Sequence, residues 1–221
     1  MLTRLRVKNF RLLRSITLDI APSHPLVLIG PNSAGRSSVL TVLDILARAT
    51  NLPLGKALAP YGPARTLGVS EPMEVEVELS AATDAPVPAG PLRYGVRFNE
   101  DGYIEREWAS QEASPSGALA QVLLSLDKDS NEHWIWNEKF KRRDEIDLDD
   151  YDGSSLAFLN FRRKRRSYRA LAEIGEALSS VQVYHGFPTN PLWVRDPREG
   201  QALAGESVTV AREASTSVRS P

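Results

Sequence analysis

The sequence has no cysteine, so disulfide bonds and thiolate metal sites are excluded, and cysteine usage says nothing about the redox compartment. It has no long apolar run either, because no stretch approaches the roughly 20 residues of a membrane-spanning helix. Neither sign of charge dominates: 27 Lys and Arg stand against 28 Asp and Glu, and the formal net charge is −1. The composition therefore gives no electrostatic argument for nucleic acid or a membrane surface as a partner.

What is present is typical of a globular protein. The chain has 221 residues, of which 42% are hydrophobic and 25% charged, enough for a sizeable core in one domain or slightly more. Its first segment, MLTRLRVKNFRLLRS, alternates basic and apolar residues and lacks the apolar core of a signal peptide. We therefore expect a cytoplasmic location and no membrane partner.

The N-terminal part of the chain has clear hydrophobic periods. Residues 2–8 and 16–20 alternate apolar and polar side chains, which predicts two half-buried strands with a short hairpin-like link. The run HPLVLIG, residues 24–30, is continuously apolar and ends in glycine, which is typical of a strand buried on both faces. Residues 37–49 then place valine and leucine at helical spacing.

The middle of the chain, about 71–137, reads as a run of antiparallel strands. MEVEVELS alternates strictly, with Val75, Val77 and Leu79 on one face and glutamates on the other. LRYGVRF and YIEREWA flank NEDG, an Asp-Gly hairpin signal, and QVLLSL and HWIWNE flank a further hairpin candidate. Before this region, the Pro- and Gly-rich residues 51–70 predict a loop.

The C-terminal part has weaker patterns. The highly charged residues 139–155 predict an exposed loop, residues 166–180 a helix and residues 181–187 a short strand. We expect a single lobe over residues 1–200, followed by a disordered tail over 201–221, where apolar periodicity is lost.

The strongest signal lies in LVLIGPNSAGRSSVL, residues 26–40, where a predicted strand runs into a glycine loop and a helix. The loop G-P-N-S-A-G-R-S matches the phosphate-binding pattern G-x-x-x-x-G-K-[ST], except that arginine replaces lysine. Glycines let successive N–H groups of residues 31–37 point into one hollow, and the helix adds its positive end. The predicted phosphate-binding residues are Gly30, Pro31, Asn32, Ser33, Ala34, Gly35, Arg36, Ser37 and Ser38.

Two serines and the arginine decide what this loop can do. Ser37 occupies the position whose hydroxyl ligates Mg²⁺, and Ser38 is a poorer candidate. Arg36 keeps the positive charge, but its planar fork is larger than an ammonium group and reaches differently. We expect weakened binding of a di- or triphosphate and a larger loss of transition-state stabilisation. The alternative is a strand–turn–helix that uses glycine for packing only.

Together with the loop, the segment LTRLRVKNFRLLRSITLDI resembles the opening of the ABC-like ATPases of the SMC, RecF and OLD group. Asn9, Phe10 and Arg11 match the group's N-F-[KR] signature, and the loop matches its G-P-N-G-[AS]-G-K-[ST] form except at Ser33 and Arg36. The resemblance is strongest over the first quarter of the chain. It implies an α/β P-loop NTPase of the ABC-ATPase type, with a mixed sheet around the phosphate loop and an antiparallel β region beside it.

The resemblance also implies ligands. ATP and Mg²⁺ would be the cofactors, with Asn32 on the γ-phosphate side, Arg11 near the adenine or ribose and Arg65 near the phosphates. DNA is a further implied partner, and FRRKRRSYR at residues 161–169 is a candidate contact to its phosphates. The alternative for this basic run is a solvated helix start balanced by the acidic run at 144–152.

The features that the group carries in its second lobe are missing from the sequence. No apolar strand ends in Asp-Glu, and no signature helix or switch histidine is recognisable, so no catalytic residue is predicted. We expect one lobe of a RecF/OLD-like ATPase, in DNA repair or phage defence, which binds ATP–Mg²⁺ and needs a homodimer or a second-lobe chain for hydrolysis. The alternatives are a nucleotide-binding or regulatory module without catalysis, and a truncated remnant.

Overall fold

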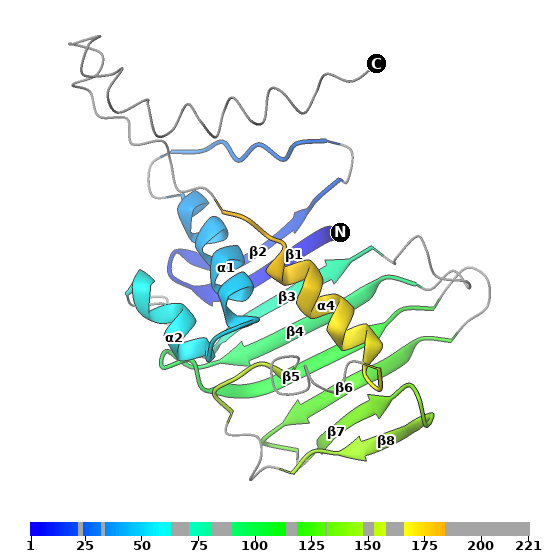
Figure 1. Ribbon diagram of the computed structural model, residues 1–221. Coiled ribbons are helices and arrows are strands. Elements are labelled where there is room, and N and C mark those ends of the chain that lie inside the picture. Colours follow the sequence, from blue (N-terminus) through cyan, green and yellow to red (C-terminus); the bar gives the residue numbers. More distant parts are fainter. Residues whose placement is uncertain are drawn as a thin grey trace, which may run out of the picture. The chain divides into compact units, whose positions relative to one another are not determined.

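Alternation of apolar and polar residues recurs along the chain, and these segments form one sheet (Figure 1). The computed structural model describes residues 1–21, 24–31, 34–62, 71–80, 90–113, 119–130, 132–147, 153–157 and 166–183. The eight strands within these residues follow the order β2-β1-β3-β4-β5-β6-β7-β8, and all neighbours are antiparallel. They are β1 (Leu2–Phe10), β2 (Leu13–Asp19), β3 (Met73–Leu79), β4 (Leu92–Phe98), β5 (Ile104–Gln111), β6 (Gln121–Asp127), β7 (Glu132–Asn137) and β8 (Arg142–Glu145).

The alternating pattern determines how the strands pair. Val7 of β1 lies opposite Val75 of β3, and both side chains are buried. The next residue, Lys8, points to the other face, where its ammonium is 2.7 Å from the carboxylate of Glu74. A slip of one residue would exchange the apolar and charged faces, so burial of the apolar face specifies the register.

The described helices lie on the apolar face of the sheet (Figure 1). They are α1 (Arg36–Ala49), α2 (Leu54–Leu58) and α4 (Arg169–Ser179), and α2 continues into a short 3₁₀ helix, η1 (Ala59–Tyr61). Val42 and Leu46 of α1 and Ile174 of α4 are at most 2% exposed and belong to the same core as the apolar face of the strands. Burial of this face supplies the main favourable term in folding.

The β7–β8 hairpin holds the N-terminal end of α4. Glu138 Oε1 accepts a hydrogen bond from the backbone N–H of Ala170 at 2.7 Å. Asp144 accepts hydrogen bonds from Asn137 Nδ2 at 2.6 Å and from the Tyr168 hydroxyl at 3.0 Å. The bond from Asn137 is the main reason for the lowered pKa of Asp144. Burial, followed by the bond to Asp144, raises the pKa of Tyr168 to about 12.

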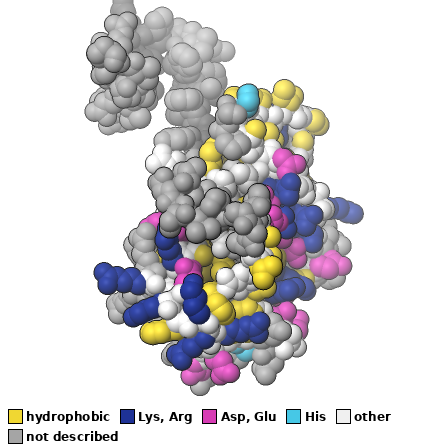
Figure 2. Space-filling view, turned by 90° about the vertical axis from the view of Figure 1, so that its right-hand side faces the viewer, with side chains coloured by type: hydrophobic (Ala, Val, Ile, Leu, Met, Phe, Trp, Pro, Cys, Tyr) yellow, Lys and Arg dark blue, Asp and Glu magenta, His cyan; other side chains and the backbone are white. Residues whose placement is uncertain are grey.

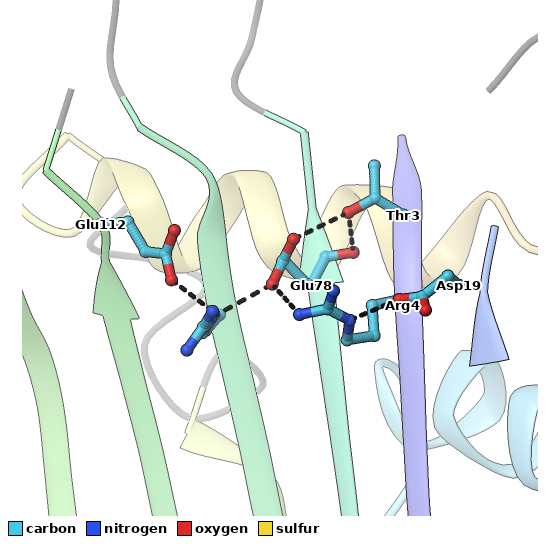
Figure 3. Close-up of polar contacts among 6 residues, drawn as sticks. Thr3, Arg4, Asp19, Glu78 and Glu112 are labelled. Atoms are coloured by element: carbon cyan, nitrogen blue, oxygen red, sulfur yellow. Dashed lines mark hydrogen bonds and ion pairs between the residues drawn. The ribbon is translucent and has the colours of Figure 1, made fainter. Parts of the chain in front are cut away.

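The opposite face of the sheet carries a row of cross-strand ion pairs (Figure 3). Arg4 Nε is 2.6 Å from Asp19, and Arg4 Nη1 is 3.4 Å from Glu78. Arg93 continues the row, because its Nε is 3.2 Å from Glu78 and its Nη2 pairs with Glu112. Each cation of the row faces a carboxylate, so the row is not the basic patch that a nucleic-acid backbone requires.

Most of the predicted elements are confirmed. The hairpin from 2–8 to 16–20 is present as β1 and β2, and the predicted helices at 37–49 and 166–180 are present as α1 and α4. The region 71–137 contains β3 to β7, including both predicted hairpins. These segments share long, regular periods, which local sequence is sufficient to specify.

The predicted buried strand at 24–30 is wrong. These residues form no strand, and Leu26, Val27 and Ile29 are 47%, 71% and 90% exposed. A strand with two apolar faces needs a hydrogen-bonded strand beside it and layers above and below, and no described residue pairs with this run. The predicted mixed sheet is wrong for the same reason, since every described strand pair is antiparallel.

The sequence patterns miss α2 and β8. The first lies in the predicted loop 51–70, and its 5 residues are too few to show a helical period. β8 lies in the predicted exposed loop 139–155, and its residues RRDE contain no apolar side chain. Hydrogen bonding to β7, rather than burial, makes this segment a strand.

Several predictions lie outside the described residues. The predicted short strand at 181–187 is described only at residues 181–183, which form no strand. The predictions that the structure does not describe concern residues 63–70 of the loop, 158–165 with most of the basic run, 184–187 of the short strand, and the tail 201–221.

Candidate functional site

The loop ahead of α1 ends at Gly35, whose φ is 85°. Glycine adopts this left-handed angle at little cost. The Val39 N–H donates to the Gly35 carbonyl at 3.1 Å and closes the first helical turn. Within the described part of the chain no side chain caps this end, and the first turn has no acidic residue. The N–H groups of Arg36, Ser37 and Ser38 are therefore available to an anion, which the positive end of the helix also favours.

Pro31 organises the earlier part of the loop. Its carbonyl accepts hydrogen bonds from the Ala34 N–H at 3.2 Å and from Arg36 Nη2 at 3.4 Å. Gly30 lies close by, since a Cβ there would be 3.2 Å from the Cβ of Ala34. Proline has no N–H, and the Ala34 N–H is already used. The expectation that successive N–H groups of 31–37 point into one hollow is therefore wrong for Pro31 and Ala34. Among the described residues, the donors that can still serve an anion lie at the start of α1.

The two serines at the start of α1 differ in exposure. Ser37 is exposed, and its hydroxyl makes no hydrogen bond to a described residue, whereas Ser38 is 5% exposed. The hydroxyl of Ser37 is therefore accessible from solvent, whereas the side chain of Ser38 is buried. Asn32, Ser33 and Arg65 lie outside the described residues, so their contacts with a nucleotide stay predictions.

The turn between β1 and β2 packs against the end of the loop. A Cβ on Gly35 would lie 2.6 Å from Leu13 Cδ2 and 3.8 Å from the Cβ of Leu12. Because Leu13 packs so closely against Gly35, only glycine fits at this position unless Leu13 moves. The sequence contains no signal of the contact, because Leu12 and Leu13 read as ordinary apolar residues beside the N-F-R signature.

Arg11, which the resemblance places near the adenine or ribose, makes a structural contact. Its Nη2 donates to the Tyr61 carbonyl, and its guanidinium carbon is 5.6 Å from the centroid of the Phe10 ring. The Tyr61 hydroxyl donates to Asp44 of α1, which also pairs with Arg48 at 2.9 Å. Arg11 thus ties the turn to η1, and a contact between Arg11 and a nucleotide stays a prediction.

Exposed hydrophobic side chains surround the loop. Besides Leu26, Val27 and Ile29, Leu12 of the turn is 61% exposed and Leu40 of α1 is 39% exposed. Figure 2 shows hydrophobic side chains gathered at the upper end of the described surface. Exposed apolar side chains are thus found in the segment before the loop, in the turn that packs against Gly35 and in the first turns of α1.

A family model described as AAA ATPase domain matches residues 1–148. The match spans more than half of the chain and includes the glycine loop, the N-F-R turn and β1 to β8. The chain belongs to the AAA ATPase domain family. A comparison with curated proteins found no match.

Membership in the AAA ATPase domain family suggests nucleotide binding, and proteins of this family generally use ATP and Mg²⁺. The α/β structure of this AAA ATPase domain, with its glycine loop and helix, fits a P-loop NTPase. Its described residues contain no group of three or more acidic or histidine side chains that could hold a metal ion by themselves. No described helix has both the length and the apolar character needed to cross a bilayer.

Proposed function

We propose that this AAA ATPase domain binds ATP–Mg²⁺ at the start of α1. The observation that carries the proposal is a helix that begins after a left-handed glycine, without a cap from any described side chain, inside the G-P-N-S-A-G-R-S loop of a chain from this family. The N–H groups of Arg36, Ser37 and Ser38 would bind the phosphates. Ser37 would offer its hydroxyl to the Mg²⁺, while Asn32 and Arg65 would complete the phosphate site.

A titration of ATP with Mg²⁺, followed by urea unfolding, tests the proposal. A ligand at about 100 times its Kd adds ~2.7 kcal/mol to the free energy of unfolding. In Ser37→Ala the stabilisation by ATP should lose its dependence on Mg²⁺, whereas Ser15→Ala, at an exposed position of β2, should behave like the unmodified protein. Equal stability with and without ATP–Mg²⁺ would contradict nucleotide binding at this loop.

We further propose that a second chain completes the site, either a second copy of this chain or a second-lobe ATPase chain. The support is the exposed apolar run with Leu26, Val27 and Ile29, whose backbone forms no strand with any described residue. A partner strand beside this run would supply its hydrogen bonds and cover its side chains. Because the sequence has no apolar strand ending in Asp-Glu, we assign hydrolysis to the assembled form.

The homodimer is tested by sedimentation of the unmodified protein and of Ile29→Asp, with and without ATP–Mg²⁺. The control is Leu119→Asp, because Leu119 is similarly exposed at 89% but is remote in sequence from the loop. We expect association that Ile29→Asp removes and the control keeps. A monomer in every condition excludes the homodimer and leaves the second-lobe chain, which copurification from the native source would reveal.

The motifs support a finer proposal, that the chain is the first lobe of an ABC-type ATPase of the RecF/OLD-like branch. N-F-R at residues 9–11 and G-P-N at residues 30–32 carry it. A role in DNA repair or phage defence would follow, with DNA as a partner. If so, duplex DNA should change the Kd for ATP–Mg²⁺, since linkage makes the two affinities reciprocal. An unchanged Kd at saturating DNA would count against this branch.

A further inference from the structure

The turn after β1 has an unusual backbone. Asn9 and Arg11 have φ angles of 56° and 51°, and Phe10 between them is 0% exposed. Left-handed angles at residues other than glycine are unfavourable and persist only where the surrounding structure imposes them. Arg11 is the first residue of the two-residue turn that joins Phe10 of β1 to Leu13 of β2, a position at which hairpin turns favour a positive φ. Asn9 lies outside this turn, and asparagine tolerates the angle better than most residues do.

Hydrogen bonds to distant segments hold this turn. Asn9 Nδ2 donates to the carbonyl of Pro72, just ahead of β3, at 3.2 Å. Arg11 Nη2 donates to the carbonyl of Tyr61 at the end of η1. These partners lie 63 and 50 residues away along the chain. These distant hydrogen bonds therefore fix where the hairpin turn lies relative to β3 and η1.

The shape of the turn determines where Leu13 lies. This residue, which is 5% exposed, begins β2 and fills the space beside Gly35 that a side chain there would occupy. Gly35 is the residue from which α1 begins, and the N–H groups of its first turn have no acceptor among the described residues. A displacement of the turn would move Leu13 and, with it, the support on which Gly35 rests.

We propose that Asn9 and Arg11 are positioning residues of the phosphate site. They hold the turn whose Leu13 supports Gly35, and in this way they set the direction of the N–H donors at the start of α1. The inference rests on the proposed ATP–Mg²⁺ site. Arg11 affects the phosphate site by holding the turn in place, and no contact between its guanidinium and the nucleotide is required.

The experiment compares Asn9→Ala and Arg11→Ala with Arg14→Ala, which removes the same charge from an exposed position on β2. Asn9→Gly serves as a rescue variant, because glycine adopts the positive φ without strain and loses only the hydrogen bond. The readouts are the Kd for ATP–Mg²⁺, the free energy of unfolding in urea, and the ¹⁵N–¹H amide resonance of Gly35 without nucleotide. Should an alanine variant fail to fold, Asn9→Gly and Arg11→Lys carry the same comparison.

We expect both alanine variants to shift the Gly35 resonance and to weaken ATP–Mg²⁺ binding about tenfold. The values for Asn9→Gly should lie between those of the alanine variants and those of the unmodified protein. Arg14→Ala should change neither the resonance nor the Kd. A Gly35 resonance that stays in place in both variants overturns the proposal. Lost affinity in Arg11→Ala alone, with that resonance unmoved, identifies a direct contact with the nucleotide instead. If the unmodified protein binds no ATP, the proposed function fails, and the Gly35 resonance still decides the positioning role.

Discussion

The Tyr94 hydroxyl donates a hydrogen bond to the carboxylate of Glu107 at 2.7 Å, across β4 and β5, where the exposed fractions of the two residues are 1% and 0%. Both oxygens of Glu107 also accept the backbone N–H of Ala157, at 2.8 and 3.0 Å. A buried carboxylate is tolerated only where hydrogen bonds compensate for lost hydration. Glu107 therefore fastens the segment 153–157 to the apolar face of the sheet.

Glu107→Ala should lower the free energy of unfolding by about 3 kcal/mol, because the Tyr94 hydroxyl and the Ala157 N–H lose their acceptor inside the core. Glu107→Gln keeps one acceptor oxygen and should cost less. Urea unfolding measures both, with Glu105→Ala as the control, since that side chain is 38% exposed. A cost at Glu107 no larger than at Glu105 would contradict a structural role for the buried carboxylate.

Gly35→Ala and Gly62→Ala separate backbone strain from crowding. Gly35 has φ 85° and ψ 7°, in the left-handed helical region, where alanine should cost about 1 kcal/mol from conformation alone. Gly62 has φ 68° and ψ −157°, a region essentially restricted to glycine, where alanine should cost roughly 1–3 kcal/mol. At Gly35 the new Cβ would also lie 2.6 Å from Leu13 Cδ2, whereas no described atom lies within 4 Å at Gly62. We expect a further loss of about 1–3 kcal/mol at Gly35 and loss of ATP–Mg²⁺ binding there only. A cost of only about 1 kcal/mol at Gly35 in urea unfolding, the conformational part alone, would mean that Leu13 yields freely.

Arg36→Lys should tighten ATP–Mg²⁺ binding, by about tenfold if the pocket is otherwise intact. A compact ammonium fits between two phosphates better than the guanidinium does, and the contact at 3.4 Å between Arg36 and the Pro31 carbonyl no longer competes. Arg36→Ala, which removes that contact without supplying a cation, is the matched control and should bind less tightly than Arg36→Lys. Calorimetric titration measures each Kd, and an unchanged value in both variants would show that this side chain does not reach the phosphates.

The pairing of Asp144 with Tyr168 predicts a dependence of stability on pH. The pKa of Asp144 is lowered, chiefly by the bond from Asn137, so its contribution is present above the ordinary value of 3.8 and is lost as the pH falls through the lower folded value. The pKa of Tyr168 is raised from 10.0 to about 12, so its contribution is complete below pH 10.0 and is lost as the pH rises to about 12.

Tyr168→Phe should therefore cost about 1 kcal/mol at neutral pH, and the cost should shrink as the pH rises toward about 12, where the native tyrosine itself becomes destabilising. Asp144→Asn should be destabilising at neutral pH and nearly without effect in acid. Urea unfolding across this range gives both differences. Tyr103→Phe is a matched control, because that ring is 45% exposed. A difference for Tyr168→Phe that is constant with pH would contradict the assignment.

The spacing of apolar residues along the sequence was sufficient to predict the helices and strands whose buried faces are regular. β3 alternates over its whole length, and the resulting register places Val75 and Val77 in the core. The run around Val27 shows the limit of the method. Its apolar side chains favour burial, but no local pattern indicates which strand would pair with the run and cover it. No described strand pairs with it.

The candidate site was predictable where chemistry is encoded in consecutive residues, and not where it depends on contacts between distant ones. Glycine spacing pointed to Gly35 and the start of α1. The hydrogen bonds from Asn9 to Pro72 and from Arg11 to Tyr61 join residues 63 and 50 positions apart, and no sequence period records such pairings.

The edge strand β8 also has a consequence for handling the purified protein. Its residues RRDE present charge to any approaching strand, which discourages edge-to-edge association. Beyond β2, by contrast, the chain leaves Val27 and Ile29 in water. Aggregation in a concentrated stock would therefore begin beside the glycine loop, so precipitated material would lose access to nucleotide before it loses its folded sheet.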